Sequence, residues 1–465
     1  MDHSKRPVMA GQIKQFCHRF AQGAGHALGR VIPWQTLMRC VEEETGPYRE
    51  RIYGPLQTLM LFIEQVLSAD HGCQDAVARG VSQRVGLGHP PCSLNSGPYC
   101  KARARLALSL IERLGHEVGE RLRDAQPNAW RWRGREIKLI DGTTVSMPDT
   151  PQNQAEFPQS RTQKVGLGFP VARLVAIISL SCGGVLAWAS APCQGKGSGE
   201  TTLVRRLAPH LRPGDVVIAD RYFSGYFLLA WLFQQGVDIV MRQHQLRHTD
   251  FRRGRHLGKR DHVVDWQRPK RPAWMDVATY TAMPLTLTLR ETRVGGLVLI
   301  TSLLDARQVC KEELLELYHA RWHIELDLRA IKSVMQMDVL RCKTPEMVRK
   351  EIAVHLLAYN LVRAVMAQAA FLGQVLPRQL SFKAALQLIR AFEENLRHAP
   401  RGRLSVRRSY LLAGIAQLRI PHRPGRAEPR VVKRRTQQHP LMTRPRHDLK
   451  ADLTKQHAKR EQDLR

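Results

Sequence analysis

Short apolar runs that alternate with helical patterns between residues 129 and 243 restrict the fold of this chain more than any other feature. The run VVIA at 216–219 is apolar at every position and lies between two aspartates. Such a run is suited to a strand that is buried on both faces of a parallel or mixed sheet. Strand-like and helical segments follow one another here, so the sequence predicts an α/β layer: GREIKLIDGTTVSM, GETTLVRRLAPHL, DVVIAD, GYFLLAWLFQQG and VDIVMRQ.

The longest uncharged stretch, residues 174–195, belongs to the same layer. Two serines and the pair Gly183-Gly184 interrupt it, which argues against a membrane span. A glycine pair between two apolar, β-branched runs is typical of a hairpin turn. We therefore expect two buried strands at this place.

The patterns outside this layer give the remaining organisation of the chain. We expect a helical N-terminal region, a basic β-rich insertion that contains tryptophan, a return of the α/β pattern, a C-terminal helical region and a flexible basic tail. The tail has 13 Lys and Arg against 5 acidic residues. The predicted boundaries of these segments are 1–128, 244–294, 295–344, 345–420 and 421–465.

The charge of the chain indicates its class of partner. It has 72 Lys and Arg against 41 Asp and Glu, a formal net charge of +31. A nucleic acid is the expected partner; an anionic membrane surface or a solubility device is the alternative, but no basic amphipathic helix with an apolar side stands alone. The nine cysteines form no Cys-x-x-Cys pair and the N-terminus has no apolar signal core, so we expect free thiols and a cytoplasmic protein.

A helical pattern at 317–338 places four polar residues beside an apolar stripe: Tyr318, Arg321, Glu325 and Lys332. At about 100° per residue the four lie within one stripe, and they span about 21 Å, a length that suits successive phosphates. The alternative is a solvated helix face with ordinary ion pairs. That alternative fits poorly, because Arg321 precedes Glu325 and Lys332 is too far from Glu325 to pair with it.

Two aspartates complete a set of three carboxylates with Glu325. Asp141 follows the strand-like IKLI and Asp220 follows VVIA, so we expect both at or beside strand ends, where ligands of open α/β sheets gather. Each aspartate taken alone is more often a turn or helix-cap residue. Three clustered carboxylates need a neutralising cation, and hard oxygen ligands favour two Mg²⁺ or Mn²⁺ ions that act on a phosphodiester.

These residues resemble the signature of a known family. The spacing of Tyr318, Arg321, Glu325 and Lys332 is similar to the YREK signature of the insertion-sequence-four group of bacterial DDE transposases. The segments DGTTV, ADRYF and ITSLLD are similar to other motifs of that group, in the same order, and the resemblance extends over roughly residues 93–440.

The resemblance implies a ribonuclease-H-like core, a mixed sheet flanked by helices, with a β-rich insertion between the second aspartate and the glutamate. It implies a cut-and-paste transposase of a bacterial insertion sequence, which cuts element ends and joins the freed 3′ hydroxyls to target DNA. The implied partners are double-stranded DNA, at terminal inverted repeats and target, and a second copy in a synaptic homodimer. By this resemblance Asp141, Asp220 and Glu325 are metal ligands, and Tyr318, Arg321 and Lys332 contact DNA. Two insertion residues, Trp266 and Trp274, are candidates for stacking a flipped base, with core packing as the alternative.

Four alternatives remain open at this point. His319, His323 and Asp327 share a helix face with transition-metal spacing. The chain is alternatively an inactive or regulatory DNA-binding derivative of a transposase, or a metal-dependent nuclease without strand transfer. The long helical pattern from Glu346 is either a dimer interface or an ordinary core helix.

Overall fold

A single nine-stranded mixed sheet organises the protein. The computed structural model describes residues 31–48, 51–86, 88–397, 399–421 and 440–463. The strand order is β3-β2-β1-β4-β5-β9-β8-β7-β6. The strands are β1 Ile137–Ser146, β2 Val171–Ser179, β3 Val185–Pro192, β4 Val216–Ala219, β5 Asp238–Arg242, β6 Arg255–Gly258, β7 Asp261–Gln267, β8 Thr286–Val294 and β9 Leu297–Thr301.

The first five strands form the predicted core. β1, β2 and β3 are an antiparallel meander, and β4 and β5 add to β1 in parallel. The predicted hairpin is confirmed: β2 and β3 are joined at residues 180–184, where Gly183 has a positive φ of 76° that few other residues adopt without strain. This order is the one that a ribonuclease-H-like core requires, and the α/β prediction is confirmed.

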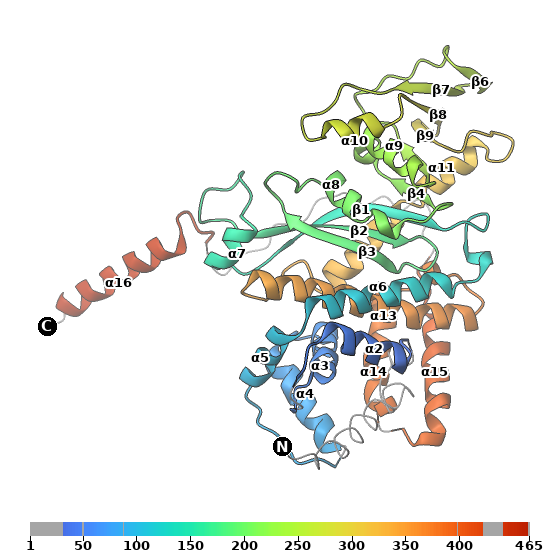
Figure 1. The fold of residues 1–465 in the computed structure, drawn as a ribbon. Helices are drawn as coiled ribbons and strands as arrows, with labels where there is room; N and C mark the ends of the chain where they lie inside the picture. Colours follow the sequence, from blue (N-terminus) through green and yellow to red (C-terminus); the bar gives the residue numbers. More distant parts are fainter. Residues whose placement is uncertain (1–30, 49–50, 87, 398, 422–439, 464–465) are drawn as a thin grey trace.

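Helices cover both faces of the sheet, and most residues of its central strands that pack against them are apolar. α8 and α9 pack on one face, and α6, α12 and α13 pack on the other (Figure 1). The helices are α2 Trp34–Glu44, α3 Pro55–Leu67, α4 Cys73–Gly86, α5 Gly97–Arg105, α6 Leu108–Asp124, α7 Pro151–Glu156, α8 Glu200–Arg206, α9 Tyr226–Gln234, α10 Val277–Ala282, α11 Lys311–His319, α12 Trp322–Arg329, α13 Pro345–Leu372, α14 Phe382–Arg397, α15 Leu404–Gln417 and α16 Arg446–Asp463.

The predicted β-rich insertion is present and continues the core sheet. β6, β7 and β8 form an antiparallel ribbon, and β8 pairs with β9, which pairs in turn with β5. The insertion therefore shares backbone hydrogen bonds with the core. A buried ion pair between Arg290 and Asp261, at 2.6 Å, links β8 to β7 within it.

The long helix α13 is the centre of a helical layer below the sheet. Most of its residues are buried against other parts of the same chain. Of the two alternatives for the helix from Glu346, a dimer interface or a core helix, core packing accounts for this burial. α13 is also the one described helix that is long and apolar enough to cross a membrane, but 89% of its most apolar window is buried inside the protein.

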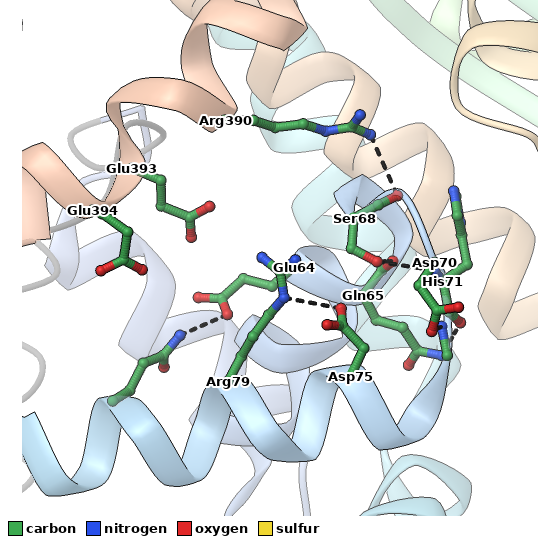
Figure 2. A network of polar contacts seen from close by, with 12 residues as sticks. Glu64, Gln65, Ser68, Asp70, His71, Asp75, Arg79, Arg390, Glu393 and Glu394 are labelled. Carbon is green, nitrogen blue, oxygen red and sulfur yellow. Dashed lines mark hydrogen bonds and ion pairs between the residues drawn. The ribbon is translucent and has the colours of Figure 1, made fainter.

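Helices of the N-terminal region, α3 and α4, and a helix of the C-terminal helical region, α14, meet in this layer. Figure 2 shows a polar network between the end of α3, the start of α4 and α14. Arg390 of α14 donates a hydrogen bond to the carbonyl of Ser68, and Gln65 and His71 brace the turn in which Ser68 lies. The two helical regions, distant in sequence, are neighbours in space.

The helix predicted at 317–338 is not continuous, which corrects the expectation. α11 ends at His319, and two residues in tight turns precede α12. The amide of Arg321 bonds the carbonyl of Tyr318, a three-residue spacing. A π-helical turn at Ala330–Val334 follows α12. Apolar periodicity does not distinguish these tighter and wider turns from an α-helix.

The C-terminal segment also differs from the expectation. Residues 446–463 form the helix α16, which projects from the body (Figure 1), where we had predicted a flexible tail. Its sequence contains many charged residues and no apolar stripe. Residues 1–30 and 422–439, part of the predicted N-terminal region and tail, lie outside the described residues.

The first prediction concerns the core role of α13. Leu356→Ala should lower the free energy of unfolding by about 2–5 kcal/mol, because Leu356 is fully buried and its truncation leaves a cavity. Leu372→Ala, at the exposed end of the same helix, should change it by less than about 0.5 kcal/mol. Urea unfolding followed by circular dichroism measures both. Equal effects would contradict the central position of α13.

Candidate active site

Asp141 and Asp220 lie side by side at the end of the parallel β1–β4 ladder. The last paired residues of this ladder are Ile140 and Ala219, so each aspartate follows directly after its end. Both occupy the face of the sheet that is covered by α12 and α13, because alternate residues of β1 and β4 pack there. Neighbouring strands are about 4.8 Å apart, which brings the two carboxylates together.

The local setting of each aspartate differs from a simple strand end. β1 continues past Asp141 to Ser146 by pairing with β2, so Asp141 is inside the strand, contrary to our expectation. Asp220 caps the short turn that follows β4 and accepts a hydrogen bond from the amide of Tyr222 at 2.7 Å. Asp220 is therefore a cap residue, as the alternative considered from the sequence holds. The cap uses only one of its two carboxylate oxygens, so the other can bind a cation.

Arg321 connects Glu325 to Asp141. Its Nη2 donates to Glu325 Oε1 at 3.0 Å, and its Nη1 lies 3.9 Å from Asp141 Oδ2. Glu325 therefore faces the aspartate pair from α12, with one guanidinium between the two carboxylates. The interpretation of this segment as a solvated face does not hold, since its polar residues point into the sheet end.

The other two residues of the helical stripe also gather here. Lys332 Nζ donates to Thr143 Oγ1 at 3.1 Å, so the lysine lies over β1, two residues past Asp141. Tyr318 is almost fully buried, and its pKa is raised by burial, an effect that the positive charges of Arg321 and Arg242 oppose. The structure thus brings all six predicted site residues to one end of the sheet.

Burial is the main influence on the electrostatics of Asp141. Burial raises the pKa of Asp141 from 3.8 to about 6. The amide of Gly142 and the charge of Arg321 lower that pKa, whereas the charges of Asp220 and Glu200 raise it further. Asp141 is therefore a carboxylate that a nearby cation would stabilise in its charged form.

The fit of a metal ion depends on the donor atoms and on Arg321. Carboxylate oxygens are the ligands that Mg²⁺ and Mn²⁺ prefer, and the like charges around Asp141 favour a divalent cation. Within the part of the chain that the structure describes, no three His, Cys, Asp or Glu side chains are close enough to hold one ion. Arg321 occupies the interval between Asp141 and Glu325, so the donor set fits a cation once this guanidinium moves.

A fourth carboxylate, Glu200, is close to the site and was missed from the sequence. A Cβ atom added to Gly142 would lie 2.6 Å from the Glu200 carboxyl group, so this carboxyl packs directly against the glycine. Glu200 also lies 3.7 Å from Arg173 of β2. Its sequence context, an acidic residue at the first turn of a helix, is too common to have singled it out.

The two tryptophans of the insertion have different surroundings. Trp266 is buried in the core, and its indole donates to Glu291 at 2.7 Å. Trp274 is 54% exposed, with the guanidinium of Arg205 4.1 Å from its ring centre. Of the two, Trp274 has ring surface that a base can contact.

The rival metal face is not supported by the geometry. Asp327 is fully buried and accepts hydrogen bonds from Arg363 and Arg378, so its oxygens are already occupied. Burial, together with the charge of Arg378, lowers the pKa of His323 to about 4. His319 is exposed at the end of α11. These three residues do not form a metal site here.

Comparison with known proteins gives the family. Residues 132–361 match the family model described as "Transposase DDE domain". The chain is 31% identical over 354 residues, 73% of this chain and 77% of the relative, to the transposase InsG of insertion sequence element IS4 of Escherichia coli K12. A shorter match, 36% over 68 residues, 15% of this chain and 18% of the relative, is to the transposase of element IS421 of Escherichia coli.

A solved structure is also similar in outline. The piggyBac transposase in a synaptic complex with hairpin DNA has a TM-score of 0.42, with 12% sequence identity, 89% of this chain covered and 87% of that chain.

The family model covers the strands of Asp141 and Asp220 and the helix of Glu325, and the long match to InsG extends well beyond it. The chain therefore belongs to the IS4 family of insertion-sequence DDE transposases.

Proposed function

We propose that this transposase cuts at the terminal inverted repeats of its own insertion sequence and joins the freed 3′ hydroxyls to target DNA. The observation that carries the proposal is the meeting of Asp141 and Asp220 at the end of one parallel ladder, with Glu325 linked to Asp141 through Arg321. Such a set of carboxylates at a sheet end suits phosphoryl transfer.

Asp141, Asp220 and Glu325 are the residues that would hold two Mg²⁺ or Mn²⁺ ions. Bound there, such ions would supply activation of an attacking oxygen and stabilisation of a leaving oxygen. In this proposal the three carboxylates would define where the reaction takes place, and Asp220 would bind the cation through the oxygen that does not cap the turn. Without a bound cation, the single positive charge of Arg321 reduces the repulsion between Asp141 and Glu325.

The cationic and aromatic residues near the carboxylates would hold the DNA strand. A guanidinium suits a bidentate grip on a phosphate, which assigns that role to Arg321 when it leaves the carboxylates. Lys332, held by Thr143, supplies a point charge on the other side of the site, and Tyr318 supplies a phenol. Trp274 is the insertion residue that we propose for stacking a flipped base, because its ring is accessible.

The charge of the chain suits the proposed partners. A formal charge of +31 favours duplex DNA of any sequence, so binding should weaken steeply as salt rises. Pairing of two element ends requires at least two copies of the protein, and we propose a homodimer for the synaptic complex. The reaction would take place in the bacterial cytoplasm, at the nucleoid.

The second prediction tests the three carboxylates. Asp141→Asn, Asp220→Asn and Glu325→Gln should each abolish cleavage of element-end DNA in Mg²⁺, because each removes a ligand charge and keeps the side-chain size. DNA affinity by mobility shift should be nearly unchanged. Glu316→Gln, an exposed glutamate on the adjoining helix α11, is the matched control and should cleave normally.

The same assay separates the alternatives for the reaction. Adding a target plasmid should give joined product with the unaltered protein, whereas a nuclease without strand transfer gives cut ends alone. A regulatory DNA-binding derivative gives neither. Near-normal cleavage by any one of the three carboxylate variants would remove that residue from the proposed ligand set.

The third prediction concerns the pKa of Asp141. Because this pKa is about 6 in the fold and 3.8 ordinarily, the folded protein retains a proton that the unfolded chain releases between pH 4 and 6. Charging Asp141 therefore costs stability as pH rises through this window. Without divalent cations, Asp141→Asn should melt at a higher temperature than the unaltered protein at pH 7.5, and this advantage should vanish at pH 4.

Thermal melts at both pH values, with chelator and with Mg²⁺, measure the effect. Mg²⁺ should raise the melting temperature of the unaltered protein at pH 7.5 and have little effect on Asp141→Asn, because a ligand that binds only the folded state stabilises it. The prediction is wrong if, at pH 7.5 without metal, the unaltered protein melts at a higher temperature than Asp141→Asn. Neighbouring positive charges would then already compensate the charge of Asp141.

The fourth prediction concerns Lys332. Lys332→Ala should slow single-turnover cleavage of saturated DNA by roughly tenfold to a thousandfold, since one well-placed charge is lost. Affinity for the duplex should change little, because 71 of the 72 basic residues remain. Thr143→Val, which removes only the hydroxyl that holds Lys332, should have a smaller effect of about 1 kcal/mol. Lys343→Ala, at an exposed lysine nearby, is the control.

A further inference from the structure

A buried polar network lies beneath the helix that carries Glu325. Asp327 has no exposed surface, and both of its oxygens accept hydrogen bonds at 2.7 Å from Arg378. Arg363 of α13 donates to the same carboxylate, and the hydroxyl of Tyr359 lies 3.0 Å from it. Two arginines and a phenol thus hold one carboxylate in place.

The network extends from α12 to the sheet. Arg378, in the turn Pro377–Gln379, also donates to the carbonyls of Leu180 and Ser179, at 2.6 and 2.8 Å, where β2 ends. β2 pairs directly with β1, the strand of Asp141. Asp327 therefore connects the helix of Glu325 to the strands that carry the other carboxylates.

The backbone at Gly183 packs directly against two residues of this network, Arg363 and Tyr359. A Cβ atom there would lie 2.8 Å from the Arg363 guanidinium carbon, so a side chain would displace the arginine. The carbonyl of Gly183 lies 3.0 Å from the Tyr359 hydroxyl. The turn between β2 and β3 is thus shaped to admit the two groups that meet Asp327.

α12 is a short helix, and the Asp327 network gives it directional contacts on its buried side. It is two turns long and lies between a tight turn at 320–321 and the π-helical turn at 330–334. Its apolar contacts, from Ile324 and Leu328, are non-directional. Around the axis of α12, the side chain of Asp327 projects about 200° from that of Glu325. Holding Asp327 in place therefore directs Glu325 to the opposite side of the helix.

We propose that Asp327 is a positioning residue, which, through Arg363 and Arg378, sets the rotation of α12 and thereby holds Glu325 toward Asp141 and Asp220. This inference rests on the proposed function, in which Glu325 is a metal ligand. Asp327 touches neither DNA nor metal in this role. A buried carboxylate with two arginines specifies one arrangement, because any rotation of α12 would leave charges unpaired.

The experiment compares Asp327→Asn with Glu325→Gln in the full chain. We would measure Mn²⁺ binding by electron paramagnetic resonance, single-turnover cleavage of element-end DNA, and melting temperature. Asp327→Asn should weaken Mn²⁺ binding, by no more than Glu325→Gln does, and slow cleavage by about a hundredfold, the effect of a small misplacement. The double variant should bind Mn²⁺ no more weakly than Glu325→Gln alone, because Asp327 acts only through Glu325.

A matched control separates positioning from loss of stability. Asp261→Asn disrupts a similar buried pair, with Arg290, in the insertion. It should lower the melting temperature and leave Mn²⁺ binding unchanged, whereas Asp327→Asn should change both. If Asp327→Asn does not fold, Arg378→Lys serves in its place, since it keeps the charge but cannot bind Asp327 and the carbonyls of Leu180 and Ser179 through three separate nitrogens.

The outcomes distinguish this inference from the proposed function. Normal Mn²⁺ binding and cleavage in folded Asp327→Asn or Arg378→Lys, with cleavage abolished in Glu325→Gln, would overturn the positioning role alone. Additive losses of Mn²⁺ binding in the double variant would also overturn it. Normal cleavage in Glu325→Gln would instead overturn the metal-ligand role of Glu325.

Discussion

The parallel pairing of β1 with β4 is the constraint on which the site depends. This ladder is short, and helices cover both of its faces, so its residues are buried and all of them except Lys138 are apolar. Its register places Asp141 and Asp220 side by side where the pairing stops. A shift of one residue in either strand would turn its aspartate to the other face of the sheet, away from α12. The packing of the central strands therefore determines the chemistry at their ends.

The sequence predicts much of this arrangement because its signals are periodic and local. The run VVIA, the glycine turn at Gly183 and the aspartates after apolar runs are each explained by nearby residues. The continuation of the sheet into the insertion depends on pairing between β5 and β9, which are far apart in sequence. Glu200 of α8 likewise approaches the site only because Gly142, on β1, has no side chain. Such contacts have no local signature.

The segment of Glu325 brings its polar residues together, although it is not the continuous helix that the sequence pattern predicts. An ideal wheel placed Arg321, Glu325 and Lys332 on one stripe, yet tight and π-helical turns interrupt that segment. The residues still converge, because Arg321 reaches Glu325 and Lys332 reaches Thr143 through long, flexible side chains. Asp327, which belonged to the rival metal face considered from the sequence, is part of the buried polar network beneath the helix.

The shared sheet gives the insertion a mechanical consequence. β8 and β9 continue the hydrogen-bonded ladder from β5, which adjoins the strand of Asp220, so continuous strand pairing connects the insertion to the proposed active site. A load applied to the outer ribbon β6–β7 must be carried through successive strands as twist of the whole sheet. The insertion and the core should therefore deform together. A force from DNA bound at the outer end of the insertion would change the distance between Asp141 and Asp220.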